Sequence, residues 1–286
     1  MNITDIITSG LLAENKIHDR IIGIYWPSEC SCKVNNKIIG NCLRQIYWKI
    51  YGASITNPTK VSTIRILKLG SIIEENEIDI AKKCSNLYVA DHIPFKMDIE
   101  GITLSGEIDA IYQQEDTCIG IEYKSGHGYY FTSRIFGSSK NPPLPKLKDI
   151  MQVMLYLLYC KDHQYNNKSI QDFKLIYIDR GTGLSKEFNI SLNNKYPIID
   201  NQEYDDFSTD DIIARFVQLD KYVKKKIIPP VDFHNYYSKN QIKKMADARM
   251  ISKIQHKKWD DNGYGLDWEC EYCPYLNRCM TKEGIR

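Results

Sequence analysis

The chain has 286 residues, of which 43% are hydrophobic and 26% are charged, so it can bury a sizeable core. Its formal net charge is only +2, which excludes a globally basic nucleic-acid binder and confines any such surface to a local patch. No run of 18 apolar residues occurs and the first residues lack a secretory pattern, so we expect no membrane span and a cytoplasmic location.

The spacing of apolar residues predicts helices near both ends of the chain and strands between them. In chain order, we predict helices over 1–20, 38–51 and 62–84, strands over 87–113 and 118–125, a loop over 126–148, a buried helix over 149–162, a hairpin over 173–192, a helix over 208–226, and a lysine-rich helix after 238. This order predicts an α/β core with a mixed central sheet flanked by helices. We divide the chain into an N-terminal helical segment (1–60), a core (61–200) and a C-terminal helical segment (201–286).

The predicted helix over 62–84 carries apolar residues at helical spacing. They are Ile66, Leu69, Ile73, Ile80 and Cys84. Residues three, four and seven apart share one face of a helix, so we expect this set to face the core.

Acidic residues interrupt two predicted strands that are otherwise apolar. Alternation along a strand places Glu122 and Lys124 on one face, and if the strands pair as neighbours, Asp109 converges with Glu122. Two close carboxylates repel each other unless a cation lies between them, and oxygen ligands favour Mg²⁺ or Mn²⁺. The backbone carbonyl of Tyr123 is a further candidate oxygen ligand. Lys124 is positioned to orient water and to stabilise a charged transition state.

The residues Asp109, Glu122-Tyr123-Lys124 and Gln152-x3-Tyr156 resemble the motifs of the PD-(D/E)xK nuclease superfamily, in its RecB-like and Cas4-like branch. The resemblance implies a restriction-endonuclease-like core in which Gln152 and Tyr156 face the site and position DNA or the lysine. Many members carry G-x-x-x-H on a helix, with the histidine as a metal ligand. Here Glu74 stands at that position, four residues after Gly70, and the resemblance implies that its carboxylate takes this role.

Cysteines cluster near the C-terminus as C-x2-C-P-x4-C, formed by Cys270, Cys273 and Cys279. Three close thiolates are good ligands for an iron–sulfur cluster or zinc, but a closed tetrahedral set needs a fourth. Cys30 and Cys32 form a C-x-C pair that competes for this role.

The sequence around Cys42, C-L-R-Q-I-Y-W, is similar to the start of Cas4-like and AddB-type nucleases. In those families one N-terminal and three C-terminal cysteines hold a [4Fe–4S] cluster. The resemblance therefore implies a four-cysteine site that joins the N- and C-terminal helical segments, with zinc in the same four thiolates as the alternative.

A basic stretch with interleaved aromatic residues follows the acidic motif. We predict DNA contacts there, because cations bind phosphates and aromatic rings stack on unpaired bases. The predicted DNA-binding residues are Tyr129, Tyr130, Arg134, Lys140 and Lys146, together with Arg44 beside Cys42.

These motifs favour a Mg²⁺- or Mn²⁺-dependent deoxyribonuclease, and the resemblance implies an exonuclease acting on single-stranded DNA or DNA ends. It also implies partner proteins in phage recombination, DNA repair or CRISPR adaptation. One alternative is a non-catalytic DNA-binding or adaptor module that retains the nuclease fold and the cluster. Another is a thiol or electron-transfer protein built around the C-terminal cysteines, which leaves the acidic residues unexplained.

Overall fold

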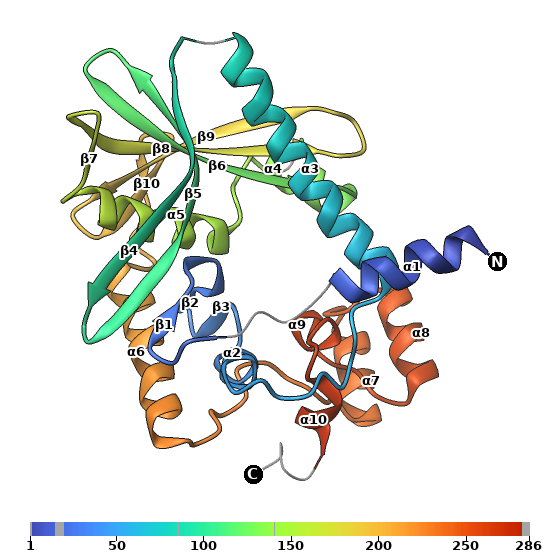
Figure 1. The fold of residues 1–286 in the computed structure, drawn as a ribbon. Coiled ribbons are helices and arrows are strands. Elements are labelled where there is room, and N and C mark those ends of the chain that lie inside the picture. Colours follow the sequence, from blue (N-terminus) through green and yellow to red (C-terminus); the bar gives the residue numbers. More distant parts are fainter. Residues whose placement is uncertain (1, 15–19, 85, 140, 282–286) are drawn as a thin grey trace.

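A mixed β-sheet runs through the centre of the molecule, with helices on its faces and at one end (Figure 1). The structure is a computed structural model that describes residues 2–14, 20–84, 86–139 and 141–281. No helix in these ranges is long and apolar enough to cross a membrane. The α/β class and the mixed sheet predicted from the sequence are confirmed.

The main sheet has the strand order β1-β5-β6-β8-β9-β10-β11, with β4 paired to β5 and β7 paired to β8. Two pairs, β1 with β5 and β6 with β8, are parallel, and the others are antiparallel. The strands of this sheet are β1 (Ile24–Tyr25), β4 (Tyr88–Ile99), β5 (Ile102–Gln114), β6 (Thr117–Gly126), β7 (Gln164–Tyr165), β8 (Lys168–Asp179), β9 (Ser185–Asn193), β10 (Tyr196–Ile199) and β11 (Gln202–Glu203). A separate hairpin consists of β2 (Ser31–Val34) and β3 (Lys37–Gly40).

The helices lie around this sheet. They are α1 (Ile3–Glu14), the 3-10 turn η1 (Pro27–Glu29), α2 (Leu43–Ile50), α3 (Val61–Cys84), α4 (Tyr129–Ile135), α5 (Leu147–Cys160), α6 (Thr209–Lys225), α7 (Lys239–Asp247), α8 (Lys253–Asn262), α9 (Trp268–Glu271) and α10 (Leu276–Met280). Ser208 is the N-cap residue of α6, and a reciprocal hydrogen-bond pair with Asp211 completes the capping box.

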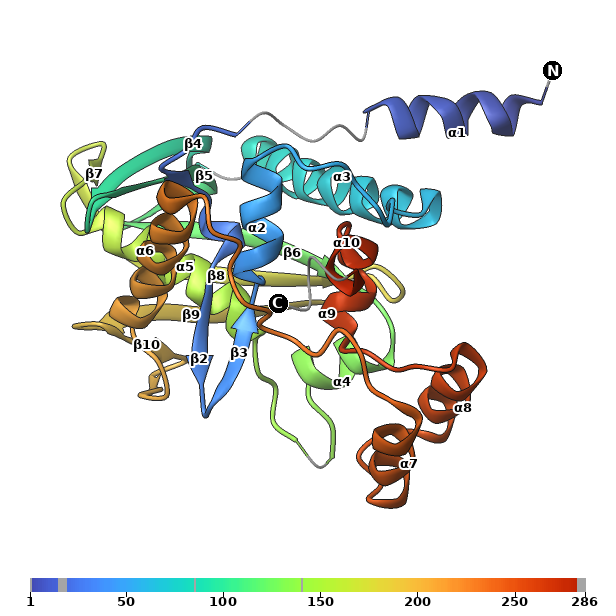
Figure 2. The same cartoon turned by 90° about the horizontal axis from the view of Figure 1, so that it is seen from below.

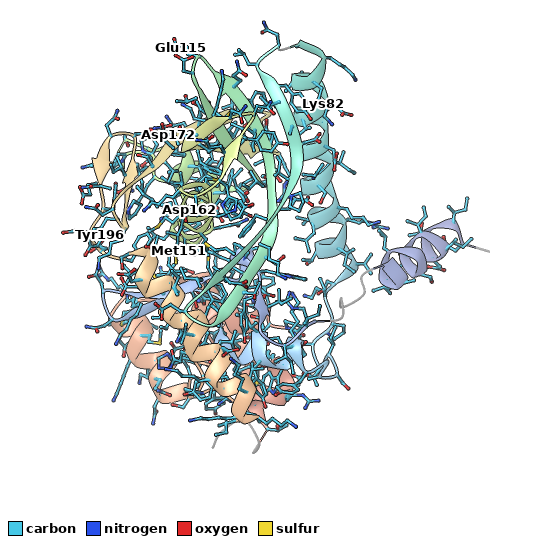
Figure 3. The ribbon with its side chains drawn as sticks, turned by 60° about the vertical axis from the view of Figure 1, so that its left-hand side comes forward. Lys82, Glu115, Met151, Asp162, Asp172 and Tyr196 are labelled. Atoms are coloured by element: carbon cyan, nitrogen blue, oxygen red, sulfur yellow. The ribbon has the colours of Figure 1, made fainter. Side chains whose placement is uncertain are left out.

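Helix α5 is the apolar centre of the fold. It belongs to the crossover that joins the parallel strands β6 and β8, which a short turn cannot connect. Ile150, Met151, Val153 and Met154 have no exposed surface, which confirms the predicted buried helix. Figure 3 shows Met151 in the crowded interior, whereas Glu115 lies at the outer tip of the β5–β6 turn. A helix buried on most sides gives the polar residue Gln152 a rigid position against the sheet.

The structure corrects three details of the sequence analysis. The predicted helix over 38–51 begins later, because residues 38–40 belong to β3. The predicted loop over 126–148 contains helix α4. Helix α3 has the predicted length but buries Ile64 and Ile78, while Ile66, Leu69 and Ile80 are 44–49% exposed and Cys84 is exposed. Ile73 of the predicted set is partly buried against the cluster that contains Ile78. The sheet covers only a narrow stripe of this isoleucine-rich helix, so the periodic pattern identified the buried face only in part.

The N- and C-terminal segments lie side by side, as Figures 1 and 2 both show for α2 and the region of α9 and α10. The backbone N–H groups of Thr56 and Asn57 both donate to the carbonyl of Pro274, each at 2.9 Å. The Asn57 side chain donates to the carbonyl of Cys273 at 2.9 Å. Hydrogen bonds therefore hold the loop of C-terminal cysteines against the N-terminal segment.

Candidate active site and cysteine pocket

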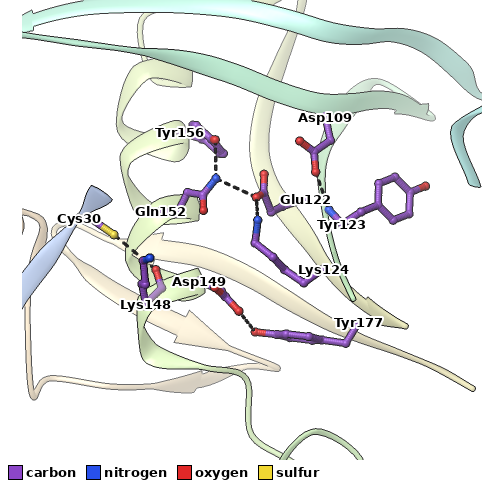
Figure 4. Close-up of polar contacts among 10 residues, drawn as sticks. All are labelled: Cys30, Asp109, Glu122, Tyr123, Lys124, Lys148, Asp149, Gln152, Tyr156 and Tyr177. Atoms are coloured by element: carbon purple, nitrogen blue, oxygen red, sulfur yellow. Dashed lines mark hydrogen bonds and ion pairs between the residues drawn. The ribbon is translucent and has the colours of Figure 1, made fainter. Parts of the chain in front are cut away.

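Strand pairing brings the two predicted carboxylates together. Strands β5 and β6 are antiparallel, and their register pairs Ala110 with Ile121, so Asp109 and Glu122 occupy the next opposing positions. The backbone N–H of Tyr123 donates to Asp109 Oδ2 at 2.7 Å, which fixes the first carboxylate (Figure 4). The predicted convergence of Asp109 and Glu122 is therefore present in the fold.

Glu122 is held from two sides. Lys124 forms an ion pair with Glu122 Oε1, in keeping with the shared strand face. Gln152 donates from Nε2 to the same oxygen at 2.8 Å and to Tyr156 Oη at 2.7 Å. Glu122 is 1% exposed, and among the described residues its other oxygen, Oε2, has no hydrogen-bond partner. A buried carboxylate oxygen without a hydrogen-bond partner costs free energy. A ligand that binds this oxygen would remove that cost.

Burial and mutual repulsion set the charge state of this group. Burial raises the pKa of both Asp109 and Glu122, and the Asp109 charge raises that of Glu122 further. Burial is the largest single influence on the pKa of Lys124 and lowers it, but the charges of Glu122, Asp149 and Asp109 together outweigh burial, so the net pKa is raised. The lysine is therefore charged, and it offsets part of the repulsion between the carboxylates.

Glu74 faces the same region from helix α3. It lines a cavity between α3 and β6 together with Lys124, and helix and strand approach closely there because Gly70 has no side chain. A Cβ at Gly70 would lie 3.2 Å from Ser125 Oγ. Burial and then the Glu122 charge raise the pKa of Glu74. Throughout the described ranges, no three His, Cys, Asp or Glu side chains are close enough to hold a metal ion, so Glu74 is a neighbour of the pair rather than a third member at ligand distance.

Two polar residues near Lys124 were missed in the sequence. Asp149, in the first turn of α5, contributes to the raised pKa of Lys124. Tyr177 on β8 donates to Asp149 Oδ2 at 2.7 Å (Figure 4). The Tyr177 hydroxyl also accepts from the backbone N–H of Lys146 at 3.0 Å. No local pattern links Asp149 to Tyr177, since 28 residues separate them. Lys124 thus lies between two carboxylates, one of which is anchored by a buried tyrosine.

We expect the Gln152→Ala variant to unfold about 1–3 kcal/mol more easily than the wild type, because Gln152 is 7% exposed and its loss removes the amide that donates to both Glu122 Oε1 and the Tyr156 hydroxyl. Urea denaturation of the metal-free protein measures this difference. The matched control is Gln171→Ala, since Gln171 is exposed on β8 and its amide donates to the neighbouring Ser169 hydroxyl at 3.3 Å. Equal losses in the two variants would show that Gln152 does not support the site.

The four predicted cluster cysteines line one cavity. Cys42, Cys270, Cys273 and Cys279 surround it, with Trp48 among the apolar walls. Burial raises the pKa of Cys273 to about 12, and the pKa values of Cys42 and Cys270 are also raised, with burial as the largest cause. The metal-free thiols of Cys42, Cys270 and Cys273 are therefore protonated. The cavity lining contains neither Cys30 nor Cys32, and Cys30 Sγ donates instead to the carbonyl of Lys148 at 3.5 Å.

Arg44 belongs to this cavity and not to an open surface, which corrects its assignment as a DNA contact. It is 3% exposed, donates to the carbonyl of Pro229 at 2.6 Å and reaches Cys279 Sγ at 3.7 Å. Its guanidinium is therefore a donor to a sulfur ligand candidate.

The other predicted DNA-binding residues lie on or near α4. Tyr129 and Tyr130 are 87% and 74% exposed. Arg134 is half-buried and donates to the carbonyl of Pro145 at 3.1 Å, whereas Lys146 is exposed and lies over the Phe131 ring. Lys140 lies outside the described residues.

Residues 65–280 match the family model described as the PD-(D/E)XK nuclease superfamily. No curated protein matches the chain. Among solved structures, the chain is similar to one titled "Crystal structure of SSO0001", with 16% sequence identity and a TM-score of 0.49, over 99% of this chain and 98% of that one.

Proposed function

The chain belongs to the PD-(D/E)XK nuclease superfamily, and from this premise we propose that it is a Mg²⁺- or Mn²⁺-dependent deoxyribonuclease whose ion is held by Asp109 and Glu122. The observation that carries the proposal is the opposition of these two carboxylates across β5 and β6, with Lys124 bound to one of them. The protein is thereby a phosphodiester hydrolase with its reacting centre at the edge of the α3–β6 cavity.

The donor set fits a hard divalent cation. Glu122 Oε2 is buried without a partner, and both carboxyls have raised pKa values in the metal-free protein. A cation satisfies the free oxygen and removes the repulsion between the carboxylates. Glu74 is the proposed third side-chain ligand, and it must approach the pair to bind. The Tyr123 carbonyl is the proposed backbone ligand.

A bound divalent ion would supply a water of lowered pKa and would stabilise negative charge on the phosphate. The chain's own residues organise the remaining chemistry. Gln152 fixes one oxygen of Glu122 and leaves the other for the ion. Lys124 carries its proton as a charged donor beside that carboxylate, where it orients the attacking water and stabilises charge developing on the phosphate. Tyr156 completes the support through its hydroxyl contact to Gln152.

Within the superfamily we propose a Cas4-like or AddB-type enzyme that carries a [4Fe–4S] cluster on Cys42, Cys270, Cys273 and Cys279. The cavity that these thiols share supports this, as does the soft sulfur chemistry of the donor set. The thiols must draw together to bind, since no three are at ligand spacing in the described chain. In this proposal the cluster joins the N-terminal segment (1–60) to the C-terminal segment (201–286) around the core (61–200).

The proposed substrate is single-stranded DNA or a DNA end. The exposed rings of Tyr129 and Tyr130 support this, because stacking on aromatic rings favours unpaired bases. Lys146 is exposed nearby and is the proposed phosphate contact, and Lys140 joins it in the proposal.

Hydrolysis of end-labelled single-stranded and duplex DNA tests the activity. We expect cleavage with Mg²⁺ or Mn²⁺, none with EDTA, and at least a roughly tenfold lower rate for the Lys124→Ala variant. Lys96→Ala, on strand β4, is the matched control, because Lys96 is exposed and away from the carboxylate pair. Binding of DNA without cleavage under any divalent ion would instead support a non-catalytic adaptor.

A further inference from the structure

The helices α7 and α8 form a projecting hairpin with a strongly positive charge. Residues 239–262, from the start of α7 to the end of α8, contain seven lysine and arginine residues against three aspartates, although the whole chain has a net charge of only +2. The rest of the chain is therefore net acidic. Figures 1 and 2 both show this hairpin extending from the end of the molecule away from the sheet.

The cations of this hairpin are exposed and mostly without acidic partners. Lys258 pairs with Glu271, but for the other six no ion pair is present within the described residues. They are Lys239, Lys243, Lys244, Arg249, Lys253 and Lys257. Six positive charges without ion-pair partners on two short helices repel one another. A densely charged anionic partner would relieve most of this repulsion and would therefore bind favourably.

The base of the hairpin is firmly held. Tyr237 and Gly265 exchange backbone hydrogen bonds of 2.6 and 3.1 Å, and the buried ring of Trp259 stacks on Tyr237 at 5.6 Å. The Tyr237 hydroxyl donates to Asp267 at 2.8 Å, three residues before Cys270. The charged surface is thus attached rigidly to the segment that carries the cysteines, and is preformed for binding.

The tip of the hairpin is apolar. Met250 is 71% exposed and Ile254 is 84% exposed, and in the sequence the exposed cations Arg249 and Lys257 precede and follow them. A partner that fits this surface must present an apolar face flanked by phosphates. The end of a DNA duplex has this character, because the terminal base pair exposes a flat apolar face and the two backbones pass on either side of it.

We propose that the α7–α8 hairpin binds the end of a DNA duplex, with its lysines on the phosphates and with Met250 and Ile254 against the terminal base pair. This inference rests on the proposed nuclease function and specifies its substrate as DNA that carries a duplex end. It assigns to the hairpin a role in holding DNA and none in cleavage.

The test measures binding of a fluorescent duplex in EDTA, so that it does not depend on catalysis. We expect the variant Lys243→Gln/Lys244→Gln/Lys257→Gln to bind roughly tenfold more weakly, and the slope of log affinity against log salt to fall by about 3. The matched control, Lys221→Gln/Lys225→Gln/Lys226→Gln, removes the same charge at the end of α6 and is expected to bind as the wild type does. Arginine at the three hairpin positions should restore binding.

A second comparison tests the tip. The wild type is expected to bind an open duplex more tightly than the same duplex closed by loops at both ends, and the variant Met250→Ser/Ile254→Ser is expected to lose this preference. Equal affinity of the hairpin and control variants would overturn the proposal. The proposal would also be overturned if the hairpin lysine variant bound DNA as the wild type does but lost binding to vesicles that contain phosphatidylserine. That result would show that the hairpin binds a membrane. Absence of cleavage by a wild type that still shows these binding differences would contradict only the nuclease proposal.

Discussion

The Asp109→Asn variant is expected to cleave DNA about 1,000-fold more slowly than the wild type while folding normally, and Glu122→Gln is expected to do the same. Both substitutions remove a charge that the proposed ion requires and keep the size of the side chain. Asparagine can still accept the hydrogen bond from the N–H of Tyr123, so the β5–β6 pairing remains intact. Initial rates on single-stranded DNA with Mn²⁺ measure the effect.

The same Asp109→Asn variant is expected to be at least as stable as the wild type when metal is absent. The folded protein raises the pKa of Asp109, so the folded state binds this proton more tightly than the unfolded chain does. Stability of the wild type therefore decreases as pH rises from the unfolded pKa of about 4 through the folded value, and asparagine removes this loss.

Urea denaturation in EDTA at pH 5 and pH 8 measures this linkage. The free energy of unfolding of Asp109→Asn should exceed that of the wild type by more at pH 8 than at pH 5. The control is Asp116→Asn, which makes the same carboxylate-to-amide change in the exposed β5–β6 turn. A variant that loses both activity and stability would indicate a structural role for Asp109 in place of the proposed metal site.

Loss of a cluster cysteine is expected to produce the second large effect. Cys273→Ser should abolish iron binding and destabilise the protein by roughly 3–5 kcal/mol, the size expected when a cross-link that closes a long loop is removed. The Cys273→Ser variant keeps the hydrogen bonds from the Asn57 side chain to the carbonyls of Glu271 and Cys273. We therefore expect this variant to fold, with a lower free energy of unfolding than the wild type. Metal content and thermal unfolding of anaerobically purified protein provide the measurement.

The matched control for this prediction is Cys84→Ser, because Cys84 is exposed at the end of α3 and away from the cavity. We expect about four irons per chain and absorption near 400 nm in the wild type and the control. One zinc per chain without colour would replace the iron–sulfur assignment by the zinc alternative. Iron retained in Cys273→Ser would refute the four-cysteine site.

Local patterns were sufficient to predict the carboxylate pair. Asp109 and Glu122 lie on adjacent strands joined by a short turn, and side-chain alternation with antiparallel pairing then decides where they meet. The contact of Lys124 with Glu122 follows from the same strand face, whereas Gln152 was predicted to position DNA or the lysine and contacts Glu122 instead.

Long-range packing decided the features that the sequence analysis missed. Arg44 lies two residues after the candidate ligand Cys42, and the sequence analysis predicted it to be exposed. In the fold, α2 packs against the C-terminal segment, and this packing buries Arg44. Asp149 and Tyr177 meet only because α5 lies across β8. Helix α3 carries isoleucines on several sides, so periodicity could not select the stripe that the sheet covers.

The most direct test of the site is Mn²⁺ binding, measured by electron paramagnetic resonance at neutral pH. The account predicts that the wild type binds Mn²⁺ and that Asp109→Asn and Glu122→Gln each lose most of this binding, while Asp116→Asn binds normally. Mn²⁺ binding that is unchanged in the first two variants would contradict the claim that these carboxylates share an ion.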